Sequence, residues 1–254
     1  MSNDDEVTKV FGHLTGEIHS ELCANCGGCI VSCPVDSLEL EGGRPSLKGR
    51  CTACGLCYSA CSQVVSEEEM IRRFYGEEAS FSGIEPYEEV YAAKTTSPEI
   101  ENSAQDGGVV TSLLSSLLDV GFLDGAVVMG RDSEWRPEPR VVTSREDLID
   151  TAGSKYSPGA SLLALRKAVD LYSLEKIALV GVPCQIKAFR AMSTGDRVVR
   201  RITDRVRLAI GLFCGECFPY EGFFKKVIED QMDIKLSNVT KFNLGDDKFV
   251  IHQD

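Results

Sequence analysis

The stretches CANCGGCIVSC (residues 23–33) and CTACGLCYSAC (residues 51–61) share one cysteine spacing, C-x2-C-x2-C-x3-C. They form an internal repeat, because the first cysteines of the two copies are 28 residues apart. This spacing is typical of proteins that bind two [4Fe-4S] clusters. It therefore predicts a small cysteine-rich module with one-electron chemistry. The expected ligands are Cys23, Cys26, Cys29, Cys33, Cys51, Cys54, Cys57 and Cys61.

The two runs are expected to exchange their last ligands, because the fourth cysteine of each run ligates the other cluster in paired modules of this kind. One cluster is then assigned to Cys23, Cys26, Cys29 and Cys61, and the other to Cys33, Cys51, Cys54 and Cys57. Pro34 follows Cys33 as usual, whereas Ser62 follows Cys61. The alternative is a pair of zinc sites, which normally use separated C-x2-C pairs, often with His. The third cysteine of each run comes too soon for that, and all three histidines lie outside the runs.

Length and composition predict a globular chain of two parts. A chain of 254 residues exceeds one ordinary domain, and 43% of its residues are hydrophobic. We expect a two-cluster ferredoxin domain at 1–80, of the α+β class, and a larger α/β domain at 81–254. No apolar run is long enough for a membrane span, and the acidic start lacks the pattern of a signal peptide. The sequence therefore predicts a cytoplasmic protein, in which clustered cysteines are more often metal ligands than disulfides.

The charge balance argues against a polyanionic partner. The formal net charge is −12, so the chain as a whole repels nucleic acid. Any cofactor that carries phosphate needs a local site built from helix N-termini and a few basic side chains.

The second part alternates between helical and strand patterns. Helices are predicted at 109–118, 158–172, 185–192 and 220–230, and strands at 125–129, 141–142, 176–182 and 206–213. Residues 87–94 favour a further strand that leads into this part. Such alternation predicts a mixed or largely parallel sheet with helical cover.

Three further cysteines lie near strand ends on this map. Cys184 and Cys214 each follow a predicted strand, and Cys217 completes a C-x2-C step with Cys214. Ligands bind at the carboxyl ends of parallel strands in open α/β sheets. These cysteines could supply three ligands of a third cluster, and the alternative is that they are ordinary thiols.

Two loops have the character of a cofactor site. Gln105, Asp106, Gly107 and Gly108 precede an apolar helix, where free N–H groups and the helix dipole favour phosphate. Residues 153–156 form a second loop with Ser154, Lys155 and Tyr156. The alternatives are an N-cap at Asp106 and a simple glycine turn. The sequence contains no G-x-G-x-x-G or Walker A run.

The ordered motifs of this part resemble the beta-subunit family of coenzyme F420-reducing hydrogenases and dehydrogenases. The motifs are QDGGVVT (105–111), DGAVV (124–128), AGSKY (152–156), VGVPCQ (180–185) and GLFC (211–214). Their resemblance covers about residues 87–254. Family members with a fused two-cluster ferredoxin module look most like the whole chain.

The resemblance implies an FAD held by the two loops, with the deazaflavin docking over its ring. The expected cofactor-binding set is Gln105, Asp106, Gly107, Gly108, Thr111, Ser154, Lys155, Tyr156, Pro183 and Gln185. It also implies a third [4Fe-4S] cluster that draws on Cys184 and Cys214. Family members usually continue further and bring another cysteine pair, so we expect a truncated domain or a substitution by Cys217. Lys155, Lys187 and Arg190 are candidate contacts for the anionic deazaflavin.

The resemblance further implies an oxidoreductase subunit that passes electrons between coenzyme F420 and the clusters through FAD. The expected partners are other oxidoreductase subunits, such as a hydrogenase, a formate dehydrogenase or a heterodisulfide reductase, with no nucleic acid and no transmembrane segment. Two alternatives stay open. One is a ferredoxin-dependent reductase of the same family that works without F420, and the other is a pure electron-transfer subunit.

Overall fold

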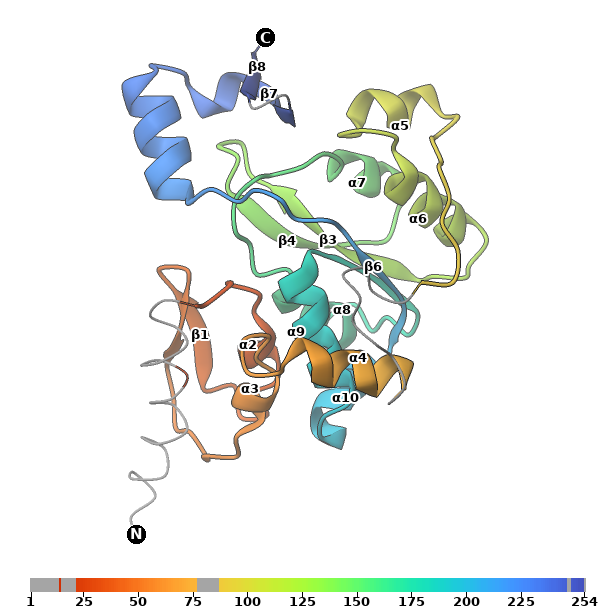
Figure 1. Ribbon diagram of the computed structural model, residues 1–254, viewed down its shortest axis with the longest axis vertical. Helices are drawn as coiled ribbons and strands as arrows, with labels where there is room; N and C mark the ends of the chain where they lie inside the picture. Colours follow the sequence, from red (N-terminus) through yellow and green to blue (C-terminus); the bar gives the residue numbers. More distant parts are fainter. Residues whose placement is uncertain (1–13, 15–21, 77–86, 246–247, 254) are drawn as a thin grey trace. The chain divides into compact units, whose positions relative to one another are not determined.

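The computed structural model describes residues 14, 22–76, 87–245 and 248–253. The chain forms two compact units (Figure 1). The first comprises the described residues within Met1–Ala92 together with Cys184–Asp204, and the second comprises those within Ala93–Pro183 and Arg205–Asp254. The boundary predicted at residue 80 lies outside the described residues. The segment Cys184–Asp204 belongs to the same unit as the cysteine repeat, which the sequence pattern did not indicate.

The first unit is built from short elements around the two cysteine runs. Its elements are α2 (Gly28–Val31), β1 (Leu38–Glu41), β2 (Arg44–Leu47), α3 (Leu56–Ser59), α4 (Glu67–Tyr75), α9 (Pro183–Ser193) and α10 (Arg197–Thr203). Strands β1 and β2 form an antiparallel hairpin between the two runs. Each run thus consists of a loop followed by a one-turn helix, in agreement with the predicted repeat.

Helices α4 and α9 of this unit are in direct contact. The Arg190 guanidinium on α9 lies 4.3 Å from the centre of the Phe74 ring on α4. Arg73 on α4 donates a hydrogen bond of 2.7 Å to the Thr194 hydroxyl, just after α9. A cation over an aromatic face and a charge-assisted hydrogen bond each stabilise this pairing modestly.

The second unit contains a four-stranded sheet covered by helices. Its elements are α5 (Pro98–Ser103), α6 (Val109–Asp119), β3 (Gly125–Arg131), β4 (Pro137–Val142), α7 (Arg145–Asp150), α8 (Leu162–Asp170), β5 (Ile177–Gly181), β6 (Val206–Gly211), the π-helix η2 (Tyr220–Gln231), the 3-10 helix η3 (Leu236–Asn238), β7 (Val239–Gly245) and β8 (Lys248–Gln253).

The strands of this sheet lie in the order β4-β3-β5-β6. Strand β3 pairs with β4 in antiparallel fashion, and both β3 and β6 are parallel to β5. The sheet is therefore mixed, which confirms the predicted fold class of this part. Strands β7 and β8 form a separate antiparallel hairpin.

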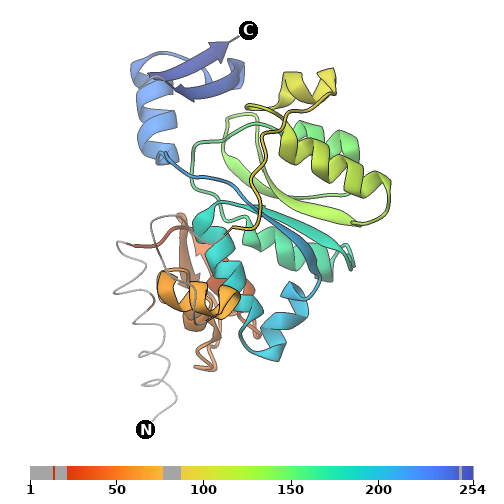
Figure 2. The ribbon, with the colours of Figure 1, turned by 45° about the vertical axis from the view of Figure 1, so that its right-hand side comes forward.

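The core of the second unit lies on both faces of the sheet. Leu114 of α6 and Leu148 of α7 pack with Ala126, Val128 and Val180 on one face. All residues of β5 are buried, and α8 covers the opposite face along β3 and β4 (Figure 2). Strands buried on both faces explain the continuous apolar runs in the sequence.

A second hydrophobic cluster is rich in aromatic side chains and links η2 to the β7–β8 hairpin. Trp135, Phe224 and Phe242 are its buried centre. The Trp135 and Phe242 rings meet edge to face with centroids 4.5 Å apart, and the indole N–H donates a hydrogen bond of 2.9 Å to the Val239 carbonyl. Aromatic pairs of this geometry contribute about 1 kcal/mol each beyond their buried area.

The strand predicted at residues 87–94 is wrong. This segment pairs with no strand in the described part of the chain, and Tyr87, Val90 and Tyr91 are exposed. Its β-branched and aromatic residues suggested a strand, but a strand requires a neighbour that supplies backbone hydrogen bonds.

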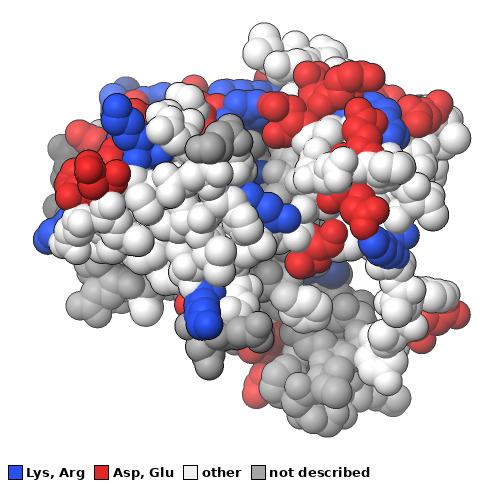
Figure 3. All heavy atoms as spheres, turned by 90° about the horizontal axis from the view of Figure 1, so that it is seen from above, with Lys and Arg blue, Asp and Glu red and all other residues white. Residues whose placement is uncertain are grey.

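The described helices include none that is both long and apolar enough to cross a membrane. On the face drawn in Figure 3, acidic and basic side chains are interspersed among uncharged ones.

Candidate functional site

The two cysteine loops have matching backbones. Asn25 and Ala53 have φ angles of 52° and 53°, and Gly27 and Gly55 have φ angles of 84° and 77°. Gly27 and Gly55 each occupy the N-cap of the following short helix. Left-handed backbone is costly for most residues and readily adopted by glycine, so each glycine permits the tight bend before its helix.

The first pocket of this unit is surrounded by cysteines from both runs. Cys23, Cys26 and Cys29 come from the first run and Cys61 from the end of the second. Burial raises the pKa of the Cys26 and Cys29 thiols, and the neighbouring cysteines of the pocket add to the rise at Cys29. These are the four cysteines that the sequence assigns to one cluster, when the fourth cysteine of each run ligates the other cluster.

The second pocket is lined by the complementary set. Cys51, Cys54 and Cys57 come from the second run, and Cys33 from the end of the first. Burial raises the pKa of the Cys57 thiol to about 11, and the charges of the other three cysteines contribute. Apolar side chains such as Leu38 complete the wall.

N–H groups point at several of these sulfur atoms. The Ser37 N–H lies 3.3 Å from Sγ of Cys33, and the Ala53 N–H lies 3.3 Å from Sγ of Cys51. At Cys61, burial raises the thiol pKa, while the N–H groups of Gln63 and Val64 oppose the rise. Such donors favour thiolates, and a bound metal deprotonates a coordinating thiol outright.

This donor set fits an iron–sulfur cluster better than a single ion. Within the described residues, no group of three or more His, Cys, Asp or Glu side chains is arranged to hold one metal ion. In a cubane cluster each thiolate binds a different iron, so its four sulfurs lie further apart than the ligands of one ion. Four thiols around each pocket, with N–H groups directed at some of them, are the donors that such a cluster would need.

The three remaining cysteines are divided between the units. Cys184 lies at the start of α9 and is half-buried, in the first unit. Cys214 and Cys217 are exposed in the second unit, in the segment between β6 and η2. Burial raises the pKa of Cys217, and the charge of Cys214 acts in the same direction. A third cluster remains a prediction.

The two predicted cofactor loops are in contact through Gln105. Its Oε1 accepts a hydrogen bond of 3.2 Å from the Ser154 N–H. Its Nε2 donates to the Phe242 carbonyl at 3.1 Å and to Oδ1 of Asn243 at 2.7 Å. Gln105 therefore joins both loops to β7.

The first loop approaches its neighbours too closely for side chains at the paired glycines. A Cβ at Gly107 would lie 3.1 Å from the Ala93 carbonyl oxygen, and one at Gly108 would lie 3.0 Å from both Thr95 and Ile100. Gly108 also has a φ of 67° and forms the N-cap of α6 without a side-chain hydrogen bond. Asp106 is exposed and does not cap the helix, so the alternative of an N-cap there is wrong.

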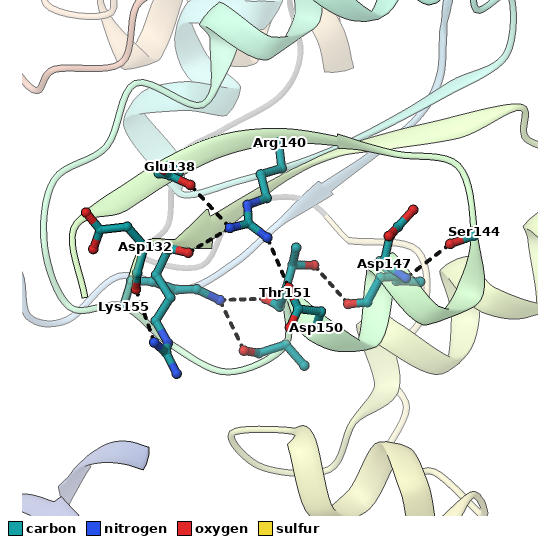
Figure 4. Close-up of polar contacts among 11 residues, drawn as sticks. Asp132, Glu138, Arg140, Ser144, Asp147, Asp150, Thr151 and Lys155 are labelled. Carbon is teal, nitrogen blue, oxygen red and sulfur yellow. Dashed lines mark hydrogen bonds and ion pairs between the residues drawn. The ribbon is translucent and has the colours of Figure 1, made fainter. Parts of the chain in front are cut away.

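Lys155 of the second loop is directed at backbone carbonyls. Its Nζ donates to the carbonyl oxygens of Thr151, Ala152 and Gly153 over 2.5 to 3.1 Å (Figure 4). These carbonyls follow α7, where the helix dipole favours a cation. Burial lowers the pKa of Lys155 to about 7, and the charges of Arg131 and Arg140 act in the same direction.

The remaining predicted residues take varied positions. Tyr156 has a φ of 53°, and its ring meets Phe249 edge to face with centroids 5.6 Å apart. Thr111 is buried on α6 and Gln185 is buried on α9, whereas Pro183 is exposed.

Sequence reasoning missed the contribution of β7 to this site. Lys241 donates hydrogen bonds to the carbonyls of Ala104 and Gln105, at 2.9 and 3.3 Å. Together with Asn243 it fixes the first loop from a strand more than 130 residues away. No local motif marks such a contact, and only a correlated pattern among relatives could have revealed it.

Comparisons with known proteins bear on both parts of the chain. Residues 90–166 match the family described as "Coenzyme F420 hydrogenase/dehydrogenase, beta subunit N-term", and residues 174–254 match the corresponding C-terminal family. The coenzyme F420 hydrogenase subunit beta of Methanothermobacter thermautotrophicus is 38% identical over 65% of this chain and 59% of its own length.

A second relative aligns with nearly the whole chain, including the cysteine repeat. The coenzyme F420-dependent sulfite reductase of Methanocaldococcus jannaschii is 36% identical over 92% of this chain, although the chain spans only 37% of that protein. A chain of the F420-reducing [NiFe] hydrogenase complex from Methanosarcina barkeri superposes with a TM-score of 0.59 at 33% identity, over 63% of this chain and 55% of the other.

Proposed function

Because the chain belongs to the family of coenzyme F420 hydrogenase/dehydrogenase beta subunits, we propose that it is an iron–sulfur flavoprotein subunit that exchanges electrons with coenzyme F420. Electrons pass between F420 and two [4Fe-4S] clusters through FAD, and from there to or from a partner oxidoreductase. One observation carries this proposal: the chain combines eight cysteines around two pockets with the paired loops joined by Gln105.

The chemistry requires a component that divides an electron pair. F420 is a deazaflavin and exchanges hydride, whereas each cluster accepts one electron at a time. A bound flavin supplies both kinds of step, and the protein contributes its placement and electrostatics. None of the described side chains needs to act as a strong acid or base in this scheme.

The residues that would hold FAD are those of the two loops. The uncapped N-terminus of α6 offers N–H groups to a phosphate, and Gly107 and Gly108 keep side chains away from that approach. Ser154 is fixed beside this end by its hydrogen bond to Gln105. Lys155 shapes the second loop through its three carbonyl contacts.

The two cysteine pockets would hold the clusters of the ferredoxin module. Cys23, Cys26, Cys29 and Cys61 would ligate one, and Cys33, Cys51, Cys54 and Cys57 the other. Cys184, Cys214 and Cys217 are the candidates for a third. Of the two basic residues on α9, Lys187 is the better candidate to contact the anionic deazaflavin, because the Arg190 guanidinium already lies over the Phe74 ring.

The test is to reconstitute the chain with iron, sulfide and FAD and to mix it with reduced F420 and a viologen dye. We expect reduced F420 to be oxidised, which is followed by the absorbance at 420 nm, and an equivalent amount of dye to be reduced. If reduced F420 is not oxidised although FAD and full iron are present, the role of F420 is contradicted. The two alternatives would then remain: a reductase of the same family that works without F420, and a pure electron-transfer subunit. About eight irons per chain would confine clusters to the cysteine repeat, and about twelve would support the third cluster.

A further inference from the structure

The two halves of the cysteine repeat have the same backbone and opposite burial. All four residues of α2 are buried, whereas none of the four residues of α3 is. Equivalent side chains follow this difference: Ile30 is 9% exposed and Tyr58 is 38% exposed. Cys26 is buried, and its equivalent Cys54 is exposed. The second loop therefore presents Cys54 to the surface.

The sequences that lead into the two runs also differ in charge. The sequence has no Lys or Arg between Lys9 and Arg44, a stretch that includes the whole first run. From Arg44 to Ser66 it has three basic residues and no acidic one, although the chain as a whole has a net charge of −12. These basic residues are Arg44, Lys48 and Arg50, and all three precede the second run. The segment that leads into the second run is thus a local positive region on an acidic protein.

The backbones of Lys48 and Arg50 are joined to Ser37, at the rim of the second pocket. Ser37 lines that pocket and is 2% exposed. Its carbonyl accepts a hydrogen bond of 2.9 Å from the Lys48 N–H, and its hydroxyl donates one of 2.5 Å to the Arg50 carbonyl. Both side chains are exposed, and neither forms an ion pair with any residue that the structure describes. The charged residues of the two segments joined here, 36–37 and 48–50, are Asp36, Lys48 and Arg50, which gives them a net charge of +1.

We infer that the second pocket, lined by Cys33, Cys51, Cys54 and Cys57, is the port through which electrons pass to or from a partner protein. The partner is a one-electron redox protein whose surface is acidic around its redox centre. This inference rests on the proposed function, because it requires a cluster in that pocket. One electron crosses in each encounter: the donor centre is oxidised and the acceptor centre reduced, and no bond forms or breaks.

The physical argument combines access and steering. Electron transfer between proteins requires the two redox centres to approach closely. The second loop, where Cys54 is exposed and no residue of α3 is buried, permits a closer approach than the first, where Cys26 and all of α2 are buried. Complementary charge around such a contact raises the association rate by ten- to a thousandfold and makes that rate sensitive to salt. Because the chain has a net charge of −12, it repels an acidic partner as a whole, whereas Lys48 and Arg50 attract that partner. The position of these two residues therefore determines where the partner docks.

The test uses charge reversal at this rim. The chain and the variant K48E/R50E are loaded with clusters, reduced with stoichiometric dithionite and mixed in a stopped-flow instrument with an acidic two-cluster ferredoxin. We expect the second-order rate constant of the variant to fall by tenfold or more at low ionic strength and its decrease with salt to disappear. With cytochrome c, a basic one-electron acceptor, the variant should react faster than the unmodified chain.

The matched control is R197E/R200E, which reverses two exposed charges on α10 in the same unit, outside both cysteine loops. A loss of rate equal to that of K48E/R50E would overturn the docking site, as would unchanged rates in the rim variant with both clusters loaded. The milder K48Q/R50Q should give an intermediate loss. The assay uses neither F420 nor FAD, so failure of the flavin chemistry leaves it intact, whereas failure to load any iron would contradict the proposed function itself.

Discussion

The backbone N–H of Ser154 donates a hydrogen bond of 3.2 Å to Oε1 of Gln105, across 49 residues of sequence. The side-chain amide of Gln105 also donates, through Nε2, to the Phe242 carbonyl and to Oδ1 of Asn243. One side chain thus holds together the two loops that we propose bind the flavin, and the hairpin behind them. The position of each loop depends on this amide.

Replacing Gln105 tests this connection. In Gln105→Glu the donor is lost, and a carboxylate faces the acceptors on Phe242 and Asn243, so we expect a loss of about 1–3 kcal/mol of unfolding free energy. Flavin affinity should fall about tenfold or more, because the loops lose their common anchor. Urea unfolding and fluorescence titration with FAD measure the two effects. Gln231→Glu, at the exposed end of η2, is the control and should change neither quantity.

Removal of the Lys155 ammonium should loosen the second loop. Lys155→Met leaves three carbonyl groups without their shared donor, so we expect a loss of about 1–3 kcal/mol near pH 7. Lys167→Met, at an exposed position on α8, serves as the control. Equal stability of the two variants would show that the loop does not depend on Lys155.

The pH dependence of the same variant follows from the lowered pKa of Lys155. Burial lowers this pKa to about 7 in the folded chain, below the unfolded value of about 10.4. The unfolded state therefore binds more protons between these values, and the contribution of Lys155 to stability rises with pH in that window, by at most about 1.4 kcal/mol per unit. The difference in unfolding free energy between the unmodified chain and Lys155→Met should grow from pH 7 to pH 9. A constant difference would show that the three carbonyl contacts keep the ammonium charged in the folded state.

The left-handed backbone at Gly55 predicts a local effect on the second pocket. A Cβ there would meet no atom within 4 Å, so Gly55→Ala adds backbone strain without a clash, at a cost of about 1–2 kcal/mol. We expect this variant to lose iron from one cluster during dilution while the other stays loaded. Gly215→Ala, where space is also open and φ is not left-handed, should retain both.

The exchange of last ligands can be tested by pairing single variants. Cys61→Ser and Cys26→Ser should remove the same cluster, because both side chains line the first pocket. Cys33→Ser and Cys54→Ser should remove the other. Electron paramagnetic resonance of the reduced variants distinguishes the clusters by their signals and potentials. If Cys33→Ser instead resembled Cys26→Ser, each run would ligate its own cluster.

Features with a short-range physical cause could be predicted from the sequence. The spacing of the cysteines determined which of them surround one pocket, because a loop and a one-turn helix of fixed length leave little freedom. The buried strand β5 and the amphipathic helix α6 followed from apolar periodicity. The mixed sheet followed from their alternation.

Features that depend on distant partners could not be predicted from the sequence. The contacts of Lys155 are local, yet a cation in a loop can equally reach outward, so its hydrogen bonds to three nearby carbonyls could not be predicted either. The contacts of Lys241 and Asn243 to the first loop join segments without any shared motif. Helix α10, which begins at the Asp196 cap, was overlooked because its seven residues are too few for a clear periodicity.

The grouping of α9 and α10 with the cysteine repeat limits how the protein can be taken apart. The backbone passes between the two compact units after Ala92, after Pro183 and after Asp204. A fragment that ends at residue 92 would therefore lack the helix whose Arg190 covers Phe74. No single cleavage therefore separates the two compact units intact. A fragment that contains the whole first unit would need residues 184–204 joined to the amino-terminal segment.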